Sequence, residues 1–511
     1  MKQKSLFLTL GLLLSVGSLL AQTNITLYPE LAKTKIDKEI YGQFAEHLGR
    51  CIYGGIYVGE QSDIPNIHGF REDVVGALED MKIPVLRWPG GCFADTYHWK
   101  DGIGPKQDRP SIINVNWGGA TEDNSFGTHE FLDFCNLIHA EPYINLNVGS
   151  GTVQEAADWI EYVNSSNVSP MTKLRKKNGR DKPWHVNYWG IGNETWGCGG
   201  NMTPEYYADV YNRFATFCRG NIFRIASGPN GDDYNWMKVM MQKTSRHPNL
   251  IQGISLHNYT FENSWGDKGS ATKFDEKGWI KVLSNTLKMK TLIERHSSIM
   301  DQYDPAKRVG LIVDEWGDWF NAAPGNNNGV LYQQNTLRDA LVAGINLNIF
   351  NNHADRVKMA NIAQAVNVLQ AVILTKGKEM VLTPTYYVFK LYAVHQDATL
   401  IPIHLNTKPY QYAGESVPTV NVSASRKDGI ISITLCNLNP DKAEPIHLKL
   451  NEFDNTRASG QIITARHMTD YNTFGQNEKV NIQPFQISNP ENGNLDFELP
   501  AKSVVLVQLK K

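Results

Sequence analysis

Two glutamates follow apolar runs that have the composition of buried strands. Glu194 comes after the run at residues 188–191, with Asn193 directly before it, and Glu315 comes after the run at residues 310–313. Hydrolysis of a glycosidic bond requires one carboxyl group that protonates the leaving oxygen and a second that acts as nucleophile or base. The pair therefore predicts a glycosidase with Glu194 as acid/base and Glu315 as nucleophile of a retaining mechanism. Such a mechanism predicts carboxyl groups about 5 to 5.5 Å apart.

Each glutamate taken singly is better explained as an ion-pair partner or as a carboxylate at a helix start. Their joint occurrence at two strand ends is what favours catalysis. The amide of Asn193 could hold the sugar hydroxyl next to the reacting carbon, and Arg87 or Tyr259 could keep Glu315 ionised. Glu46, after another apolar run, could bind sugar or could form an ion pair with a neighbouring arginine.

Residues 39–385 alternate short apolar runs with amphipathic helical patterns, which is typical of repeated βα units around a parallel sheet. In a (β/α)8 TIM barrel the carboxyl ends of all strands face one mouth. Glu194, after the fourth run, and Glu315, after the seventh, would therefore meet there. Helices are predicted over residues 70–81 and 204–218, the second with Thr203 as its N-cap. Eight strands are predicted, at residues 40–44, 85–88, 143–148, 187–191, 225–227, 253–257, 310–313 and 347–350.

The pattern changes near residue 386 to an alternation with a period of two. Residues 420–424 and 431–435 flank a turn at Asp428-Gly429, and residues 503–509 alternate in the same way. This pattern indicates a C-terminal antiparallel β-sandwich, jelly-roll-like in type. The predicted organisation is a signal peptide at residues 1–21, a strand segment at 22–38 that joins the sandwich, a catalytic barrel at 39–385 and the sandwich at 386–511.

The first 21 residues have the pattern of a secretory signal. Lys2 and Lys4 precede an apolar run at residues 6–20, and Ala21 is a small residue at a plausible cleavage point. The run is short for a membrane span, and no later stretch reaches the roughly 20 apolar residues that a span needs. We therefore expect a secreted or periplasmic protein with no membrane contact once the signal is removed.

Composition excludes several kinds of partner. The formal net charge is -2 and both signs of charge are mixed along the chain, so nucleic acid is not an expected partner. No Cys/His/Asp cluster has metal-ligand spacing and no glycine-rich segment has the context of a phosphate loop, so neither metal nor organic cofactor is expected. The cysteines show no pairwise spacing, so we expect mostly buried thiols and no disulfide framework; they are Cys51, Cys92, Cys135, Cys198, Cys218 and Cys436.

Four motifs make the chain resemble glycoside hydrolase family 51, the α-L-arabinofuranosidases. They are IYGQFAEHLGR at residues 40–50, LRWPGGC at 86–92, GNE at 192–194 and VDEW at 313–316, and the likeness runs in order over nearly the whole mature chain. The resemblance implies the same roles for Glu194 and Glu315 as the strand-end argument. It also implies an arabinofuranose pocket formed by Glu46, Arg87, Cys92, Trp117, Asn193, His257, Tyr259, Trp319 and Gln364.

The resemblance further implies an exo-acting enzyme that releases terminal arabinofuranose from arabinan- or arabinoxylan-type polysaccharides or oligosaccharides. Members of the family are often hexamers, so a homo-oligomer is possible. Cys92 stands where some members have asparagine, and a thiol is a weaker hydrogen-bond donor, so one sugar contact would be weakened.

Two other functions stay open at this point. An endo-acting β-glycanase, such as an endoglucanase or xylanase, would use the same two-glutamate barrel and differ only in the shape of its pocket. A secreted carbohydrate-binding protein that had lost catalysis would be marked by a missing carboxylate, and none is missing.

Overall fold

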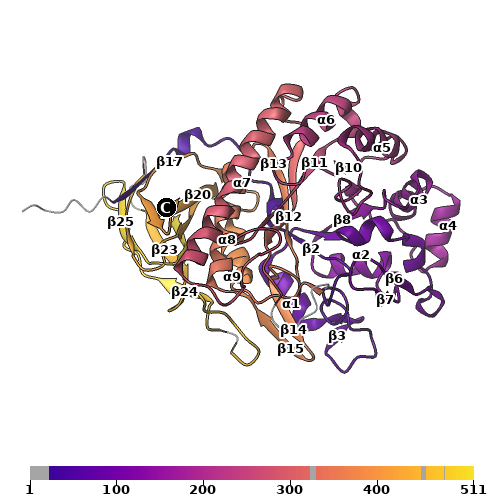
Figure 1. Cartoon of the computed structure of the whole chain (residues 1–511), viewed down its shortest axis with the longest axis horizontal. Coiled ribbons are helices and arrows are strands. Elements are labelled where there is room, and N and C mark those ends of the chain that lie inside the picture. Colours follow the sequence, from indigo (N-terminus) through magenta and orange to yellow (C-terminus); the bar gives the residue numbers. More distant parts are fainter. Residues whose placement is uncertain (1–21, 323–329, 451–455, 477, 511) are drawn as a thin grey trace, which may run out of the picture.

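The computed structural model of the chain describes residues 22–322, 330–450, 456–476 and 478–510. The predicted signal peptide at residues 1–21 lies outside the described residues. The chain forms a closed barrel of eight parallel strands with a strand-rich C-terminal part beside it (Figure 1). The predicted fold class, a (β/α)8 barrel with a C-terminal antiparallel β-sandwich, is confirmed.

The barrel strands form one closed sheet in which every neighbouring pair is parallel. Their carboxyl ends consequently meet at one mouth. In chain order the strands are β2 (Gly42–Phe44), β5 (Val85–Trp88), β8 (Glu141–Leu146), β9 (Tyr188–Ile191), β10 (Phe223–Ala226), β11 (Gly253–Thr260), β12 (Gly310–Asp318) and β13 (Val357–Ala363).

One predicted barrel strand is wrong. Residues 347–350 lie inside helix α8 (Leu337–Asn352), and the eighth strand is β13, which follows that helix. Almost every residue of α8 is buried, because the helix packs between the barrel and the C-terminal sheets. A helix that is apolar on all sides has no 3.6-residue periodicity, so a short run within it looks like a buried strand.

The other helices surround the barrel. Thr203 caps α5 as predicted, since its side chain accepts a hydrogen bond from the backbone N–H of Tyr206. The helices are α1 (Glu72–Met81), α2 (Thr128–Leu137), α3 (Val153–Asn164), α4 (Pro170–Lys177), α5 (Pro204–Phe217), α6 (Tyr234–Thr244), α7 (Glu276–Tyr303) and α9 (Pro384–Tyr392). No helix among the described residues is long and apolar enough to cross a membrane.

The C-terminal sandwich consists of a four-stranded and a six-stranded sheet with an apolar core between them. The first sheet has the order β17 (Ile403–Asn406), β1 (Thr23–Leu27), β22 (Glu444–Leu450) and β25 (Asn494–Leu499). The second has the order β16 (Thr399–Leu400), β20 (Val420–Lys427), β21 (Ile430–Asn437), β26 (Ser503–Lys510), β23 (Arg457–Ile463) and β24 (Ile482–Phe485). The N-terminal strand β1 thus lies in the same sheet as strands some 380 residues later in the chain. The predicted domain boundaries at residues 38 and 385 stay predictions.

Barrel and sandwich share an apolar core. In Figure 1, helices α7, α8 and α9 stand between the sandwich strands and the barrel strands. Helix α8 contacts β20, β21 and β26, and the buried side chains of Cys436 and Val504 belong to the same hydrophobic cluster as the residues between the barrel strands and the surrounding helices. Gly344 of α8 permits this close approach, because a Cβ at that position would lie 2.8 Å from the Sγ atom of Cys436.

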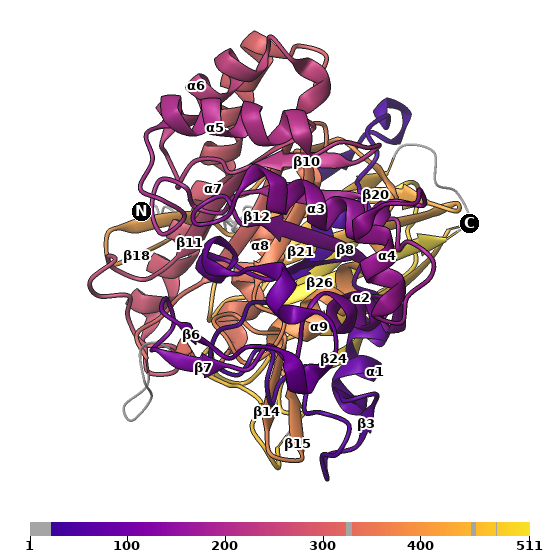
Figure 2. The ribbon, with the colours of Figure 1, turned by 90° about the vertical axis from the view of Figure 1, so that its right-hand side faces the viewer.

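Four short hairpins stand outside these sheets. They are β3–β4 (Asn66–Ile67 and Phe70–Arg71), β6–β7 (Ile112–Asn114 and Ala120–Glu122), β14–β15 (Ile373–Lys376 and Glu379–Leu382) and β18–β19 (Pro409–Tyr412 and Glu415–Pro418). Figures 1 and 2 place β6–β7 on the barrel side of the molecule, away from the sandwich.

Candidate active site

Glu194 lies at the barrel mouth, in the turn that follows β9. Its backbone φ is +39°, in the left-handed region that residues other than glycine rarely occupy. Its carbonyl oxygen accepts hydrogen bonds from the backbone N–H groups of Gly197, at 2.7 Å, and Gly199, at 3.1 Å. Strained backbone of this kind persists only where the surroundings hold it, and it is concentrated at functional sites.

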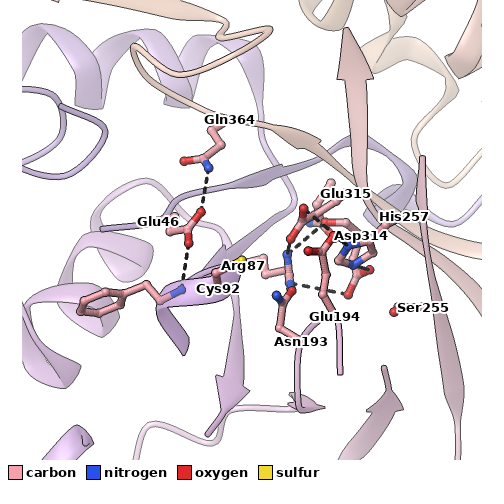
Figure 3. A network of polar contacts seen from close by, with 12 residues as sticks. Glu46, Arg87, Cys92, Asn193, Glu194, Ser255, His257, Asp314, Glu315 and Gln364 are labelled. Carbon is pink, nitrogen blue, oxygen red and sulfur yellow. Dashed lines mark hydrogen bonds and ion pairs between the residues drawn. The ribbon is translucent and has the colours of Figure 1, made fainter. Parts of the chain in front are cut away.

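Glu315 lies within β12 and faces the same cavity as Glu194 (Figure 3). The Nη1 atom of Arg87 donates to its Oε1 atom at 2.8 Å, and the hydroxyl of Tyr259 donates to its Oε2 atom at 2.8 Å. Both carboxylate oxygens are therefore oriented by donors from two other barrel strands. A fixed carboxylate of this kind is what a nucleophile requires.

His257 connects the two glutamates. Its Nδ1 atom lies 2.9 Å from Glu194 Oε1 and 3.5 Å from Glu315 Oε2, and its Nε2 atom lies 3.0 Å from Asp314 Oδ1. Burial works against the charged imidazole, but Glu315, Asp314 and Glu194 together raise the pKa of His257 to about 10. The ring is therefore an imidazolium that donates from Nδ1 to Glu194 and forms an ion pair through Nε2 with Asp314. One carboxylate oxygen of each glutamate and a nitrogen of this ring all lie within 4.8 Å of one another.

Glu194 is held in a form that suits an acid. Burial raises its pKa and the nearby charge of Glu315 raises it further, while the hydrogen bond from His257 opposes both; the net pKa lies above the usual value. A raised pKa favours the protonated form of a glutamic acid, which is the form that can donate a proton to a leaving oxygen. The two carboxyl groups are thus adapted to different tasks by their neighbours.

Arg87 and Asn193 lie beneath the cavity rather than on its wall. Both are about 1% exposed, and Arg87 Nη2 donates to Asn193 Oδ1 at 2.6 Å. The hydroxyl of Tyr143 donates to the carboxylate of Asp314 at 2.7 Å, and the Arg87 guanidinium helps to lower the pKa of Asp314 against the effect of burial. This buried layer fixes both Glu315 and His257 from below.

The cavity above this layer has a volume of about 510 Å³. Its inner wall carries buried polar groups and its outer wall carries tryptophans, one of which, Trp265, is 61% exposed. Nine of the site residues predicted from sequence line it: Glu46, Cys92, Trp117, Glu194, His257, Tyr259, Glu315, Trp319 and Gln364. Leu48, Gly91, Trp196, Asn230, Trp265, Leu331 and Leu369 complete the lining.

Glu46 lies on the wall of the cavity opposite Glu194 and Glu315. Its Oε1 atom accepts from the Trp117 indole at 2.7 Å and from the Phe93 backbone at 3.0 Å. Its Oε2 atom accepts from Gln364 at 3.2 Å (Figure 3). Burial and the charge of Glu315 raise the pKa of Glu46 to about 7. A Cβ at Gly91 would lie 2.5 Å from Glu46 Oε2, so only glycine permits this packing.

Glu194, His257 and Glu315 are close enough to hold a metal ion between them. The Glu315 oxygens already accept hydrogen bonds from Arg87 and Tyr259. The same groups are better matched to proton transfer and nucleophilic attack.

The prediction that the cysteines are unpaired is wrong for one pair. Cys92 and Cys198 form a disulfide across the barrel mouth, and the cysteines that remain free are buried: Cys51, Cys135, Cys218 and Cys436. The pair was hidden in the sequence because its members lie 106 residues apart, in the loops after β5 and β9. Cys92 therefore has no S–H group to donate, contrary to the expectation of a weak thiol donor.

Sequence reasoning missed one anchoring carboxylate, Asp95. Its Oδ1 atom accepts from the backbone N–H groups of Val148 and Gly149, both at 2.9 Å, and its Oδ2 atom accepts from that of Asn193 at 3.1 Å. Asp95 thereby ties the loop after β8 to the turn that carries Glu194. It follows the LRWPGGC motif by three residues, but nothing in the sequence shows which backbone groups it meets.

Comparison with known proteins identifies the family. A family model described as alpha-L-arabinofuranosidase 1 domain matches residues 77–277, and one described as alpha-L-arabinofuranosidase C-terminal domain matches residues 314–503. An intracellular exo-alpha-L-arabinofuranosidase from Bacteroides ovatus is 53% identical over 518 residues, which cover 100% of both chains. The chain belongs to glycoside hydrolase family 51, the α-L-arabinofuranosidases.

Solved structures of this family agree with the assignment. The GH51 arabinofuranosidase from Xanthomonas axonopodis pv. citri is 48% identical, with a TM-score of 0.94 over 96% of this chain and 100% of that one. An arabinose complex of the alpha-L-arabinofuranosidase from Thermotoga maritima is 30% identical, with a TM-score of 0.82 over 95% and 99% of the two chains. This glycoside hydrolase thus matches the arabinofuranosidases of the family in its fold as well as in its sequence.

The expectation of a secreted or periplasmic protein is wrong on the same comparison. The Bacteroides ovatus relative, which matches over the full length, is named as an intracellular enzyme. That expectation rested on Lys2 and Lys4, the short apolar run that follows them and Ala21, and residues 1–21 lie outside the described part of the chain.

Proposed function

We propose that this family 51 enzyme removes single terminal α-L-arabinofuranosyl groups by a double displacement in which Glu315 is the nucleophile and Glu194 the acid/base. The observation that carries the proposal is the pair of carboxyl groups that face one cavity, with oxygens within 4.8 Å of one another. Oxygens this close match the short separation of retaining enzymes rather than the wider separation of inverting ones.

In the first step Glu315 attacks the anomeric carbon while Glu194 donates its proton to the departing oxygen. The covalent glycosyl-enzyme ester is then hydrolysed by a water from which Glu194 removes a proton, so that both glutamates return to their starting states. His257 follows the changing charge of Glu194, because its Nδ1–H group, 2.9 Å away, donates more strongly to the carboxylate than to the acid.

The inner cavity wall offers hydrogen bonds for one sugar ring. Gln364 Oε1 is buried and has no hydrogen-bond partner within the described chain, and Glu46 lies beside it. A sugar hydroxyl would satisfy that oxygen, because a buried acceptor without a partner is costly. We assign Glu46, Gln364 and Tyr259 to the bound arabinofuranose, with Arg87 and Asn193 supporting it from below.

The outer wall fits the part of the substrate beyond the scissile bond. Trp319 packs edge-on against Tyr259, with ring centroids 5.2 Å apart, and against Trp265, with centroids 4.9 Å apart. Aromatic faces suit the apolar faces of sugars. The B. ovatus relative is named an exo-acting enzyme, and we propose terminal arabinose on arabinan- or arabinoxylan-type chains as the substrate. The hexamer implied by family resemblance stays a prediction, which light scattering would check.

The first test replaces the nucleophile. Glu315→Ala is expected to lower kcat on an aryl α-L-arabinofuranoside on the order of 10⁴- to 10⁶-fold, because no covalent intermediate can form. Circular dichroism and binding of L-arabinose should be close to those of the unmodified enzyme. Glu155→Ala is the matched control, since Glu155 lies on α3 away from the cavity and pairs there with His98. Substantial turnover by Glu315→Ala would disprove the assignment.

The endo-glycanase alternative has no observation in its favour. Family 44 structures, including a xyloglucanase from Paenibacillus polymyxa at 13% identity and a TM-score of 0.61, share the fold alone. Release of reducing ends from a β-glucan, measured beside release of arabinose from arabinan, would distinguish the two activities.

A further inference from the structure

The β6–β7 hairpin supplies one wall of the active site through a single side chain. Trp117 lies in the turn of this hairpin, lines the cavity and donates to Glu46 Oε1 at 2.7 Å. The outward-facing Ile113 and Val115 of the same hairpin are 68% and 67% exposed. Ile112 and Trp117 of the hairpin pack against the core, and polar contacts at its base also hold it on the barrel.

The base of the hairpin is tied to the residue next to Glu46. Glu122, the last residue of β7, meets His47, with Oε2 and Nδ1 2.7 Å apart and both side chains about 4% exposed. On the other strand, Asn114 Nδ2 donates to the His47 carbonyl at 2.5 Å, and Asn114 Oδ1 accepts from the Trp117 backbone at 3.2 Å. Both strands of the hairpin thus contact His47, the residue next to Glu46. These contacts hold Trp117 and Glu46 in place.

The hydrogen positions in this contact follow from its partners. The Trp88 indole nitrogen, which can only donate, lies 3.0 Å from His47 Nε2. Nε2 is therefore the acceptor, and the proton of the neutral ring sits on Nδ1 and points at Glu122. The ring stacks on Phe93, with centroids 4.5 Å apart, so its orientation is fixed as well.

Glu122 receives donors on both of its oxygens. Oε2 accepts from His47, and Oε1 accepts from the hydroxyl of Tyr53 and from the backbone N–H of Asn124, the latter at 2.8 Å. An ionised carboxylate is an acceptor only and satisfies all three donors. A glutamine of nearly the same shape would turn its NH₂ group toward a donor in either orientation.

We infer that Glu122, acting through His47, is a positioning residue for substrate binding: it holds the β6–β7 hairpin so that Trp117 closes the cavity and keeps Glu46 in place. The inference rests on the proposed function, because it assigns Trp117 and Glu46 to the sugar pocket. Glu122 itself touches neither the cavity nor the catalytic pair, and nothing in the two-step mechanism uses it.

The test is Glu122→Gln, assayed on an aryl α-L-arabinofuranoside. Loss of a hydrogen bond to a charged group, about 1.5 kcal/mol, corresponds to about a tenfold change. KM is therefore expected to rise about tenfold, while kcat changes by less than about threefold because Glu194 and Glu315 keep their neighbours. Tyr53→Phe removes one donor to the same carboxylate and should shift KM in the same direction by a smaller factor. It also carries the test if Glu122→Gln does not fold.

A double-mutant cycle separates positioning from general stability. If Glu122 acts through Trp117, then Glu122→Gln should add little to the KM of Trp117→Phe. Asp496→Asn is the matched control, since it breaks a 2.7 Å contact with His447 in the sandwich and should leave KM unchanged. An unchanged KM in Glu122→Gln with a lowered melting temperature, or full additivity with Trp117→Phe, would overturn the inference. Absence of arabinofuranosidase activity in the unmodified enzyme would instead refute the proposed function.

Discussion

At the scale of single residues, the site separates two chemically identical side chains by their neighbours. Glu315 accepts from Arg87 and Tyr259, whereas Glu194 is half-buried beside the charge of Glu315 and has a raised pKa. The donor that Glu194 does have, His257, is held as an imidazolium by Asp314 on the other side of its ring. Asp314, adjacent to Glu315 in sequence, therefore acts on Glu194 through the imidazole.

This asymmetry predicts a pH effect. Glu194 must be protonated to act as an acid, so kcat/KM of the enzyme should fall as pH rises through its raised pKa. Glu194→Ala should lose that alkaline fall. On an activated aryl arabinofuranoside the variant should keep part of its kcat, whereas on a poor leaving group the loss should be about 10²- to 10⁴-fold. Added azide should restore turnover, because it attacks the intermediate without a base.

Glu155→Ala serves again as the control and should keep the alkaline limb. An alkaline limb that persists in Glu194→Ala, or azide that has no effect on any substrate, would contradict the acid/base role. The pH profiles would be measured as kcat/KM on both substrates, so that a change in binding does not hide the effect.

At the scale of elements, the mouth of the barrel is built from loops that meet only in the fold. The Cys92–Cys198 disulfide joins the loops after β5 and β9, and the second of these carries Glu194. The Sγ atom of Cys198, an exposed residue, lies 3.6 Å from Glu194 Oε2. A covalent link thus lies directly beside the Glu194 carboxyl group.

Removal of this link should lower stability. The free energy of unfolding of the double variant Cys92→Ser and Cys198→Ser is expected to be about 2–4 kcal/mol lower. The reason is that the long loop between the cysteines is no longer closed in the unfolded chain. Thermal unfolding with and without a dithiol reductant measures the effect. The reductant should shift the melting temperature of the unmodified enzyme and leave the double variant unchanged; equal shifts in both would contradict the prediction.

Sequence alone locates most elements and places Glu194 and Glu315 at the same barrel mouth. It fails where long-range packing decides the structure. Strand ends were found because a buried apolar run that ends in a carboxylate is hard to explain by packing. The run at residues 347–350 misled because burial of α8 on all sides removed its periodicity. The disulfide and Asp95 were missed for another reason, since both depend on which loops the closed barrel brings together.

At the scale of the whole molecule, α8 is the common element of barrel and sandwich. Besides the contact of Gly344 with Cys436, the Trp279 indole of α7 donates to the Leu438 carbonyl at 2.8 Å. The Asn348 side chain of α8 donates to that of Asn421 at 2.8 Å. Polar and apolar contacts therefore alternate along the interface, which fixes one orientation of the two parts.

Gly344→Ala tests the closeness of this packing. The added methyl would meet Cys436 Sγ at 2.8 Å and the Tyr392 hydroxyl at 3.2 Å. Overpacking is expected to cost about 1–3 kcal/mol, offset by up to about 1 kcal/mol of improved helix propensity. The melting temperature should fall, and Cys436→Ala in the same chain should restore part of it. A rise in melting temperature with Gly344→Ala would show that the interface has spare room.

The shared core also has a practical consequence for anyone who wishes to re-engineer the enzyme. Strand β1, which precedes the barrel, is hydrogen-bonded to β17 and β22, which follow it. The segments before and after the barrel thus pair in the same four-stranded sheet of the sandwich. A protein truncated after the last barrel strand would expose one side of α8 and leave β1 without neighbouring strands. Such truncated proteins should be insoluble. Grafts should instead exchange the surface loops around the mouth.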